Sequence, residues 1–165
     1  MSAGSRARLG IGYVPQGRGI FGRMSVAENL ALGQWIGGGA EAPNLSQVYR
    51  LFPILKERTN QQAGSMSGGQ QQQLAIGRVL VGRPDLILLD EPSEGIQPNV
   101  VQQIGQIICR LRDEHGLTVI IVEQDLLLIQ AVADRSIVMD KGTVVAQLTK
   151  ESISDPAVAK RYLAI

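Results

Sequence analysis

Residues 86–92 read Leu-Ile-Leu-Leu-Asp-Glu-Pro, a short apolar run that ends in two carboxylates and a proline. A continuous apolar run of this length is typical of a parallel strand covered on both faces, and we expect it to lie centrally in its sheet. A further strand is predicted at 9–14, and 118–122 predicts a second buried strand. Residues 137–145 predict an edge hairpin.

Helical periodicity separates these strands. Ser25 and Glu28 have the spacing of a capping box, Ser46 is expected to cap the next helix, and Pro53 is expected to bend or shorten it. Strands that alternate with helices predict an α/β domain with a largely parallel sheet, which binds ligands at the carboxyl ends of its strands. The predicted helices are 25–32, 46–55, 70–81, 98–115 and 126–133, with a break at Gly37-Gly38-Gly39 and a short helix from Asp155-Pro156.

The composition excludes several classes of protein. Sixteen basic and fifteen acidic residues give a formal net charge of +1, so no global field favours nucleic acid or an anionic membrane surface. The single cysteine, Cys109, cannot form an internal disulfide, and its apolar neighbours predict that it is buried. No apolar stretch approaches the roughly 20 residues of a membrane-spanning helix, and we expect a cytosolic protein.

The carboxylates at Asp90 and Glu91 are candidate chemical groups. A carboxylate at the tip of a buried strand can hold Mg²⁺ beside nucleotide phosphates, and a second one can orient the attacking water. The alternative is that these charges only mark the end of the strand.

A second candidate motif is Met66-Ser67-Gly68-Gly69-Gln70, which leads directly into a helix. Glycines let the backbone approach a ligand, and a helix start offers unpaired N–H donors to a phosphate. The alternative is an ordinary glycine-containing helix cap.

Taken in order, Gln16, the 66–70 motif and Asp90-Glu91 resemble the ATP-binding cassette ATPases, which carry a Q-loop glutamine, a Leu-Ser-Gly-Gly-Gln signature and a Walker B strand. The resemblance covers nearly the whole chain, from Leu9 to about Val145. It implies a P-loop NTPase-like cassette fold with a largely parallel sheet. The implied parts are a helical signature subdomain at about 25–83, the Walker B and C-terminal part of the core sheet at 84–147, and a C-terminal helix at 148–165.

The resemblance also implies roles for individual residues. Gln16 is expected to sense Mg²⁺ and water, Asp90 to support the metal, and Glu91 to act as the catalytic carboxylate. The signature residues Ser67, Gly68, Gly69 and Gln70 are expected to close over ATP held on a second subunit. Gln124 stands where most of the family has histidine, so it can hydrogen-bond a phosphate but cannot carry a proton.

The cofactors implied by this family are ATP and Mg²⁺. The implied partners are a second cassette, identical or related, two integral membrane permease subunits and, indirectly, an extracytoplasmic solute-binding protein. The expected location is the inner face of the plasma membrane, with no role for nucleic acid.

Three strings resemble the ATPases of urea importers, with branched-chain amino acid importers as the close alternative. They are Gln70 to Arg78, Ser93-Glu94-Gly95-Ile96-Gln97-Pro98 and Val122-Glu123-Gln124-Asp125. These residues line an ATPase rather than a solute pocket, so the solute is implied by resemblance alone.

No Gly-x-x-x-x-Gly-Lys-Ser/Thr string occurs in the sequence, so the Walker A cradle for the phosphates is missing. We expect a chain that begins after Walker A, through a late start or a cut, and that binds ATP poorly alone. A non-catalytic module that lends its signature to a partner is one alternative. A chromosome-maintenance ATPase is another, but no sustained heptads are present.

Overall fold

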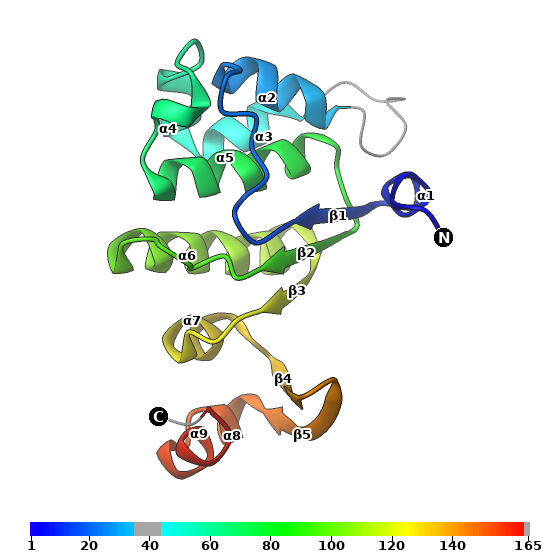
Figure 1. Cartoon of the computed structure of the whole chain (residues 1–165), viewed down its shortest axis with the longest axis vertical. Helices are drawn as coiled ribbons and strands as arrows, with labels where there is room; N and C mark the ends of the chain where they lie inside the picture. Colours follow the sequence, from blue (N-terminus) through cyan, green and yellow to red (C-terminus); the bar gives the residue numbers. More distant parts are fainter. Residues whose placement is uncertain (35–43, 164–165) are drawn as a thin grey trace. The chain divides into compact units, whose positions relative to one another are not determined.

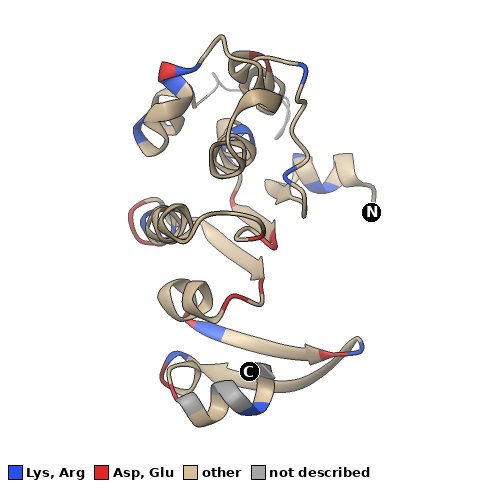
Figure 2. Ribbon diagram, turned by 60° about the vertical axis from the view of Figure 1, so that its left-hand side comes forward, with Lys and Arg blue, Asp and Glu red and all other residues tan. Residues whose placement is uncertain are grey.

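The structure, a computed structural model, describes residues 1–34 and 44–163 (Figure 1). The chain forms two compact units, Met1–Val122 and Glu123–Ile165. The predicted break at Gly37-Gly38-Gly39 lies outside the described residues. Figure 2 shows basic and acidic positions distributed among the helices and loops of each unit, in line with the near-zero net charge.

The first unit contains a parallel sheet of three strands in the order β1-β2-β3. The strands are β1 (Ile11–Val14), β2 (Leu86–Asp90) and β3 (Thr118–Val122). The predicted central position of the apolar run is therefore confirmed. Val14 pairs with Leu89, and Asp90 pairs with Val122, so all three strands end at the same edge of the sheet.

Within the first unit, the described helices cover the sheet on one face, so the predictions of a strand 86–89 covered on both faces and of a second buried strand at 118–122 are wrong. Ile87 and Leu89 are buried, and a Cβ added to Gly12 would lie 2.2 Å from Val79 of the overlying helix α5 (Gly68–Val81). On the opposite face Ile120 is 48% and Val122 59% exposed. An apolar run shows that a strand is hydrophobic but not how many helices pack on it.

Four short elements pack around α5 (Figure 1). They are α2 (Val26–Gly33), α3 (Leu45–Leu51), α4 (Pro53–Glu57) and the 3-10 helix η2 (Ala63–Ser65). Their contact surface is mainly aliphatic: Leu30, Leu55, Leu74 and Ile76 are buried almost completely. These side chains fix the start of α5 relative to the sheet.

The ends of these helices follow local sequence rules with one exception. Both bonds of the predicted capping box between Ser25 and Glu28 are present. Pro53 begins α4, which confirms that it ends the preceding helix. The predicted cap at Ser46 is wrong, because α3 begins at Leu45 with Asn44 as its N-cap and no capping bond from a side chain.

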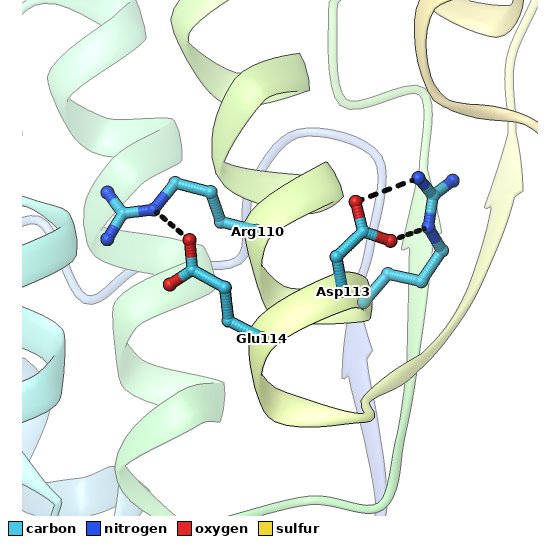
Figure 3. Close-up of polar contacts among 4 residues, drawn as sticks. Arg110, Asp113 and Glu114 are labelled. Atoms are coloured by element: carbon cyan, nitrogen blue, oxygen red, sulfur yellow. Dashed lines mark hydrogen bonds and ion pairs between the residues drawn. The ribbon is translucent and has the colours of Figure 1, made fainter.

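Helix α6 (Pro98–His115) matches its predicted bounds, with proline at its start and Gly116 in the left-handed conformation at its end. Its buried face carries Ile104 and Ile108, whereas Cys109, predicted to be buried, is partly exposed. Its exposed end carries ion pairs (Figure 3), among them Arg110 Nε to Glu114 Oε1 at 3.3 Å. Exposed pairs at this spacing contribute only about 0.3–0.5 kcal/mol, so burial rather than charge stabilises α6.

The second unit contains the predicted hairpin, which is longer than expected. It is formed by β4 (Arg135–Asp140) and β5 (Thr143–Thr149), paired antiparallel. Three helices accompany it: α7 (Leu126–Val132), α8 (Lys150–Ile153) and α9 (Pro156–Leu163). The sequence did not predict α1 (Ala3–Arg8) of the first unit. Within the described residues, no helix is both long enough and apolar enough to span a bilayer.

Candidate functional site

The predicted site residues Gln16 and Asp90 come together because β1 and β2 run in parallel. Val14 is the last residue of β1 and pairs with Leu89, so the loop after β1 and the loop after β2 leave the sheet side by side. Gln16 lies in the first loop, and Asp90 closes β2 immediately before the second. This edge is where parallel sheets hold ligands.

Asp90 accepts a hydrogen bond from a tyrosine of the neighbouring strand. The hydroxyl of Tyr13 donates to Asp90 Oδ2 at 3.0 Å. This bond raises the pKa of Tyr13, with smaller contributions from desolvation and from the Asp90 charge. Tyr13 was not among the predicted site residues, although it is the one side chain of β1 with a polar group, which was the available signal.

Glu91 has a left-handed backbone, with φ of 48°. Its backbone N–H donates to the carbonyl of Val122 at 2.9 Å, which ties the turn after β2 to the end of β3. A non-glycine residue in this conformation is strained, and such strain concentrates at functional sites. The chain therefore leaves the sheet in a turn set by residues on two strands.

Gln16 is hydrogen-bonded to the loop that follows β2. Its Nε2 donates to Glu94 Oε2 at 3.1 Å. Glu94 is itself part of a turn, because its backbone N–H donates to the carbonyl of Glu91 at 3.2 Å. The sequence contained both residues in quoted motifs but gave no reason to pair them.

Arg18 links this pair of loops to the signature helix α5. Its backbone is left-handed, with φ of 72°. Its Nη2 donates to the carbonyl of Glu94 at 3.2 Å, and its Nη1 donates to Gln71 Oε1 at 3.4 Å. Three segments that are far apart in the sequence are thus joined through one guanidinium group.

Arg78, which lies on α5 closer to its C-terminal end than Gln71, makes a second link to the loop after β1. Its Nη2 donates to the carbonyl of Gly19 at 2.8 Å, and its guanidinium group lies over the ring of Phe21, 5.2 Å from the centroid. Burial lowers the pKa of Arg78, because desolvation disfavours the charged form. The loop after β1 is therefore bonded to α5 at two positions of the helix, Gln71 and Arg78.

The signature residues form the start of α5 and a true helix cap. Ser67 Oγ accepts from the backbone of Gln70, and Gln70 Oε1 accepts from the backbone of Ser67 at 3.1 Å. The helix begins at Gly68, two residues earlier than predicted. The capping alternative is thus present in the structure, and it does not exclude a phosphate, because further N–H groups of the first turn have no partner within the helix.

Close packing leaves little room for a side chain at the two signature glycines, Gly68 and Gly69. A Cβ added to Gly69 would lie 2.6 Å from Val100 Cγ1 on α6. A Cβ added to Gly68 would lie 3.1 Å from Arg18 Nη2 and 3.3 Å from the carbonyl oxygen of Gly95. The start of α5 therefore adjoins the loop after β2.

Gln124 belongs to the second unit, two residues beyond the end of β3. Its backbone N–H and that of Asp125 both donate to Glu123 Oε1, at 2.8 and 2.9 Å. The hydrogen bond from Gln124 to a phosphate stays a prediction.

The donors at the sheet edge fit Mg²⁺. The carboxylate oxygens of Asp90 and the amide oxygen of Gln16 are hard ligands of the kind that Mg²⁺ prefers. No group of three or more His, Cys, Asp and Glu side chains within 1–34 and 44–163 is placed to hold a metal. Magnesium commonly uses one or two carboxylates together with phosphate and water oxygens, so this sparse set is sufficient.

Comparison with known proteins decides the family. A family model described as ABC transporter matches residues 2–94, more than half of the chain. The chain belongs to the ABC transporter family. The predicted fold class is confirmed, and the cofactors ATP and Mg²⁺, a paired cassette and membrane permease subunits are those of this family.

Two curated relatives are named for branched-chain amino acid transport. BraG of Pseudomonas aeruginosa, a high-affinity branched-chain amino acid transport ATP-binding protein, is 46% identical over 158 residues, which are 94% of this chain and 67% of BraG. LivG of Escherichia coli is 31% identical over 95% of this chain and 69% of its own length. These names favour the predicted alternative, and the urea prediction gains no support from them.

Solved cassettes share the fold. One solved structure is the ADP conformation of MJ1267, an ATP-binding cassette of an ABC transporter. It superposes on this chain with a TM-score of 0.76 at 26% identity, and the matched region is all of this chain and 72% of MJ1267. A dimeric cassette bound to ADP and Pi, MJ0796, has a TM-score of 0.75 at 25% identity, with 87% of this chain and 64% of MJ0796 covered. The chain thus spans about two thirds of the length of these relatives.

Proposed function

We propose that the chain is the ATP-hydrolysing cassette of an importer of branched-chain amino acids, peripheral on the cytoplasmic face of the membrane. The observation that carries the ATPase part is the placement of Gln16, Asp90 and Glu91 at one sheet edge, beside the start of α5. The names of the relatives support branched-chain amino acids as the transported solute.

Each of these residues has a distinct role in the proposed reaction. Asp90 and the amide oxygen of Gln16 would hold Mg²⁺, which supplies charge neutralisation at the transferred phosphate. Glu91 orients and polarises the attacking water through its carboxylate. Gln124, as an amide, would contribute a hydrogen bond to a phosphate oxygen and no proton transfer.

Ser67, Gly68, Gly69 and Gln70 act toward a nucleotide on the paired cassette. They present the N–H groups of a helix start and the Ser67 hydroxyl, which suit a γ-phosphate. Arg18 and Arg78 bond this helix to the loop that carries Gln16. Closure of one cassette on another would therefore change the position of Gln16 relative to the metal.

Because the sequence holds no Walker A string, the decisive experiment uses the chain extended upstream by a Walker A segment and assembled with the permease subunits of the importer. Glu91→Gln is expected to retain bound ATP and to lower turnover by at least about a hundredfold, a typical loss for a positioned acid–base group. Unchanged turnover would remove Glu91 from its role. Normal turnover in Glu91→Gln, together with a loss of turnover in Ser67→Ala, would identify the chain as a partner module that supplies only its signature.

The solute is tested separately. Leucine, isoleucine and valine are expected to stimulate the ATPase of the assembled importer in the presence of its binding protein, and urea is not. Stimulation by urea alone would restore the urea assignment and leave the ATPase proposal intact.

A further inference from the structure

We propose that Glu94 is a positioning residue that fixes the orientation of the Gln16 side-chain amide. The starting observation is the bond from Gln16 Nε2 to Glu94 Oε2 at 3.1 Å. The sequence singled out Glu94 only as part of a string resembling one subfamily, with no chemical role. The inference rests on the proposed function, because it concerns how Gln16 meets the metal.

The argument depends on the two different ends of an amide. A carboxylate only accepts hydrogen bonds, so Glu94 must face the NH₂ end of Gln16. The oxygen Oε1 is then left over, and it takes no hydrogen bond from the described part of the chain. A cation requires that oxygen, since an NH₂ group directed at Mg²⁺ would present hydrogens instead of a lone pair.

Without Glu94 the amide has no such preference. Gln16 is exposed, and both orientations of its amide can be hydrated by water. About half of the side chains would then direct NH₂ toward the metal position, and the side chain would also be free to change rotamer. Glu94 therefore selects the metal-binding orientation before any ligand arrives.

The backbone of Glu94 is itself held from both sides. Its N–H donates to the carbonyl of Glu91, and its carbonyl accepts from Arg18 Nη2. Arg18 in turn donates to Gln71 on α5. The Glu94 carboxylate therefore extends from a backbone that is held in place. This allows the exposed Glu94 side chain to orient the side chain of Gln16.

The first test is free of nucleotide. Side-chain amide signals of Gln16, assigned by their loss in Gln16→Ala, are recorded by ¹⁵N NMR in the unliganded chain. Glu94→Ala is expected to remove the distinct shift of these signals and to speed their exchange with water several-fold. Glu57→Ala, which removes an exposed glutamate of α4, is the matched control and is expected to leave them unchanged. Unchanged Gln16 signals in Glu94→Ala would overturn the proposal.

The second test measures metal dependence in the assembled importer. Glu94→Ala is expected to raise the Mg²⁺ concentration for half-maximal ATPase activity roughly three- to tenfold, the range of one ordinary net hydrogen bond between exposed groups, while the maximal rate changes less. Glu94→Gln should fall between Glu94→Ala and the unaltered protein, because an amide can meet either end of Gln16. Equal Mg²⁺ dependence in all three proteins would overturn the proposal.

The two proposals fail in different ways. Full turnover in Glu91→Gln counts against the ATPase assignment, whereas the NMR result reports on Glu94 and Gln16 without any nucleotide. A changed melting temperature in Glu94→Ala with unaltered Gln16 signals would identify a structural role only and would also overturn the proposal.

Discussion

The hydroxyl of Tyr13 on β1 donates to Asp90 Oδ2 at the tip of β2, across 3.0 Å. This bond joins two neighbouring strands at the position where the proposed metal ligand leaves the sheet. Because it connects a titratable phenol to a carboxylate, it can be followed by pH alone.

Asp90→Asn is expected to lower the pKa of Tyr13 toward its ordinary value of about 10, since an amide is a weaker acceptor than a carboxylate and carries no charge. A raised pKa in the folded state means that the bond stabilises the fold below pH of about 10, and that this is lost as pH rises through the raised value. Tyrosinate absorbance in a background with Tyr49→Phe and Tyr162→Phe measures the pKa of Tyr13, and urea denaturation at a series of pH values measures the stability. Asp140→Asn in the hairpin is the control, and an unchanged titration in Asp90→Asn would contradict the bond.

Ser67→Ala is expected to lower the free energy of unfolding by about 1 kcal/mol, because it removes the cap of α5. Urea denaturation followed by circular dichroism measures the loss. Ser46→Ala is the matched control, since Ser46 lies inside α3 and makes no capping bond, and its effect should stay within about 0.5 kcal/mol. Equal losses in the two variants would show that the cap contributes little.

Gly69→Ala is expected to lower the free energy of unfolding by about 1–3 kcal/mol, because the added methyl would lie 2.6 Å from Val100 Cγ1. Val100→Ala on the same chain should relieve most of that loss. The double variant also separates packing from phosphate contact: stability that returns without ATPase activity would assign Gly69 a role at the nucleotide. Additive losses in the double variant would rule out the contact with Val100.

Gln72→Met is expected to raise the free energy of unfolding by about 1 kcal/mol. Gln72 is 3% exposed, and its Nε2 has no hydrogen-bond partner within the described residues, so an apolar chain of similar length avoids the cost of burying an amide. Gln73→Met, at the next and less buried position of α5, is the control and should change stability little. A loss of stability in Gln72→Met would show that the amide is satisfied in solution.

Local signals predicted much of the fold because they act over a few residues. The capping box at Ser25, the proline at Pro98 and the left-handed Gly116 each fix a helix end through their neighbours. The wrong cap at Ser46 has the same origin, because Asn44 and Ser46 are both capping residues by type and only the structure shows where α3 begins.

The candidate site was predicted in outline only. Parallel topology places Gln16 and Asp90 at one edge, and the sequence order of the motifs led to the family. The partners of these residues are distant in the chain: Tyr13 bonds 77 positions away, and Gln16 bonds 78 positions away. No local pattern encodes such pairs, and the left-handed backbone of Arg18 is equally hidden in a sequence without glycine at that position.

The backbone of Glu91 allows one more conclusion. At φ of 48° a glycine would sit without strain, whereas a glutamate costs on the order of 1 kcal/mol or more. Glu91→Gly is therefore expected to relieve backbone strain at this position. If Glu91 acts as proposed, the same variant loses ATPase turnover, and thermal unfolding together with a turnover assay measures the two effects separately.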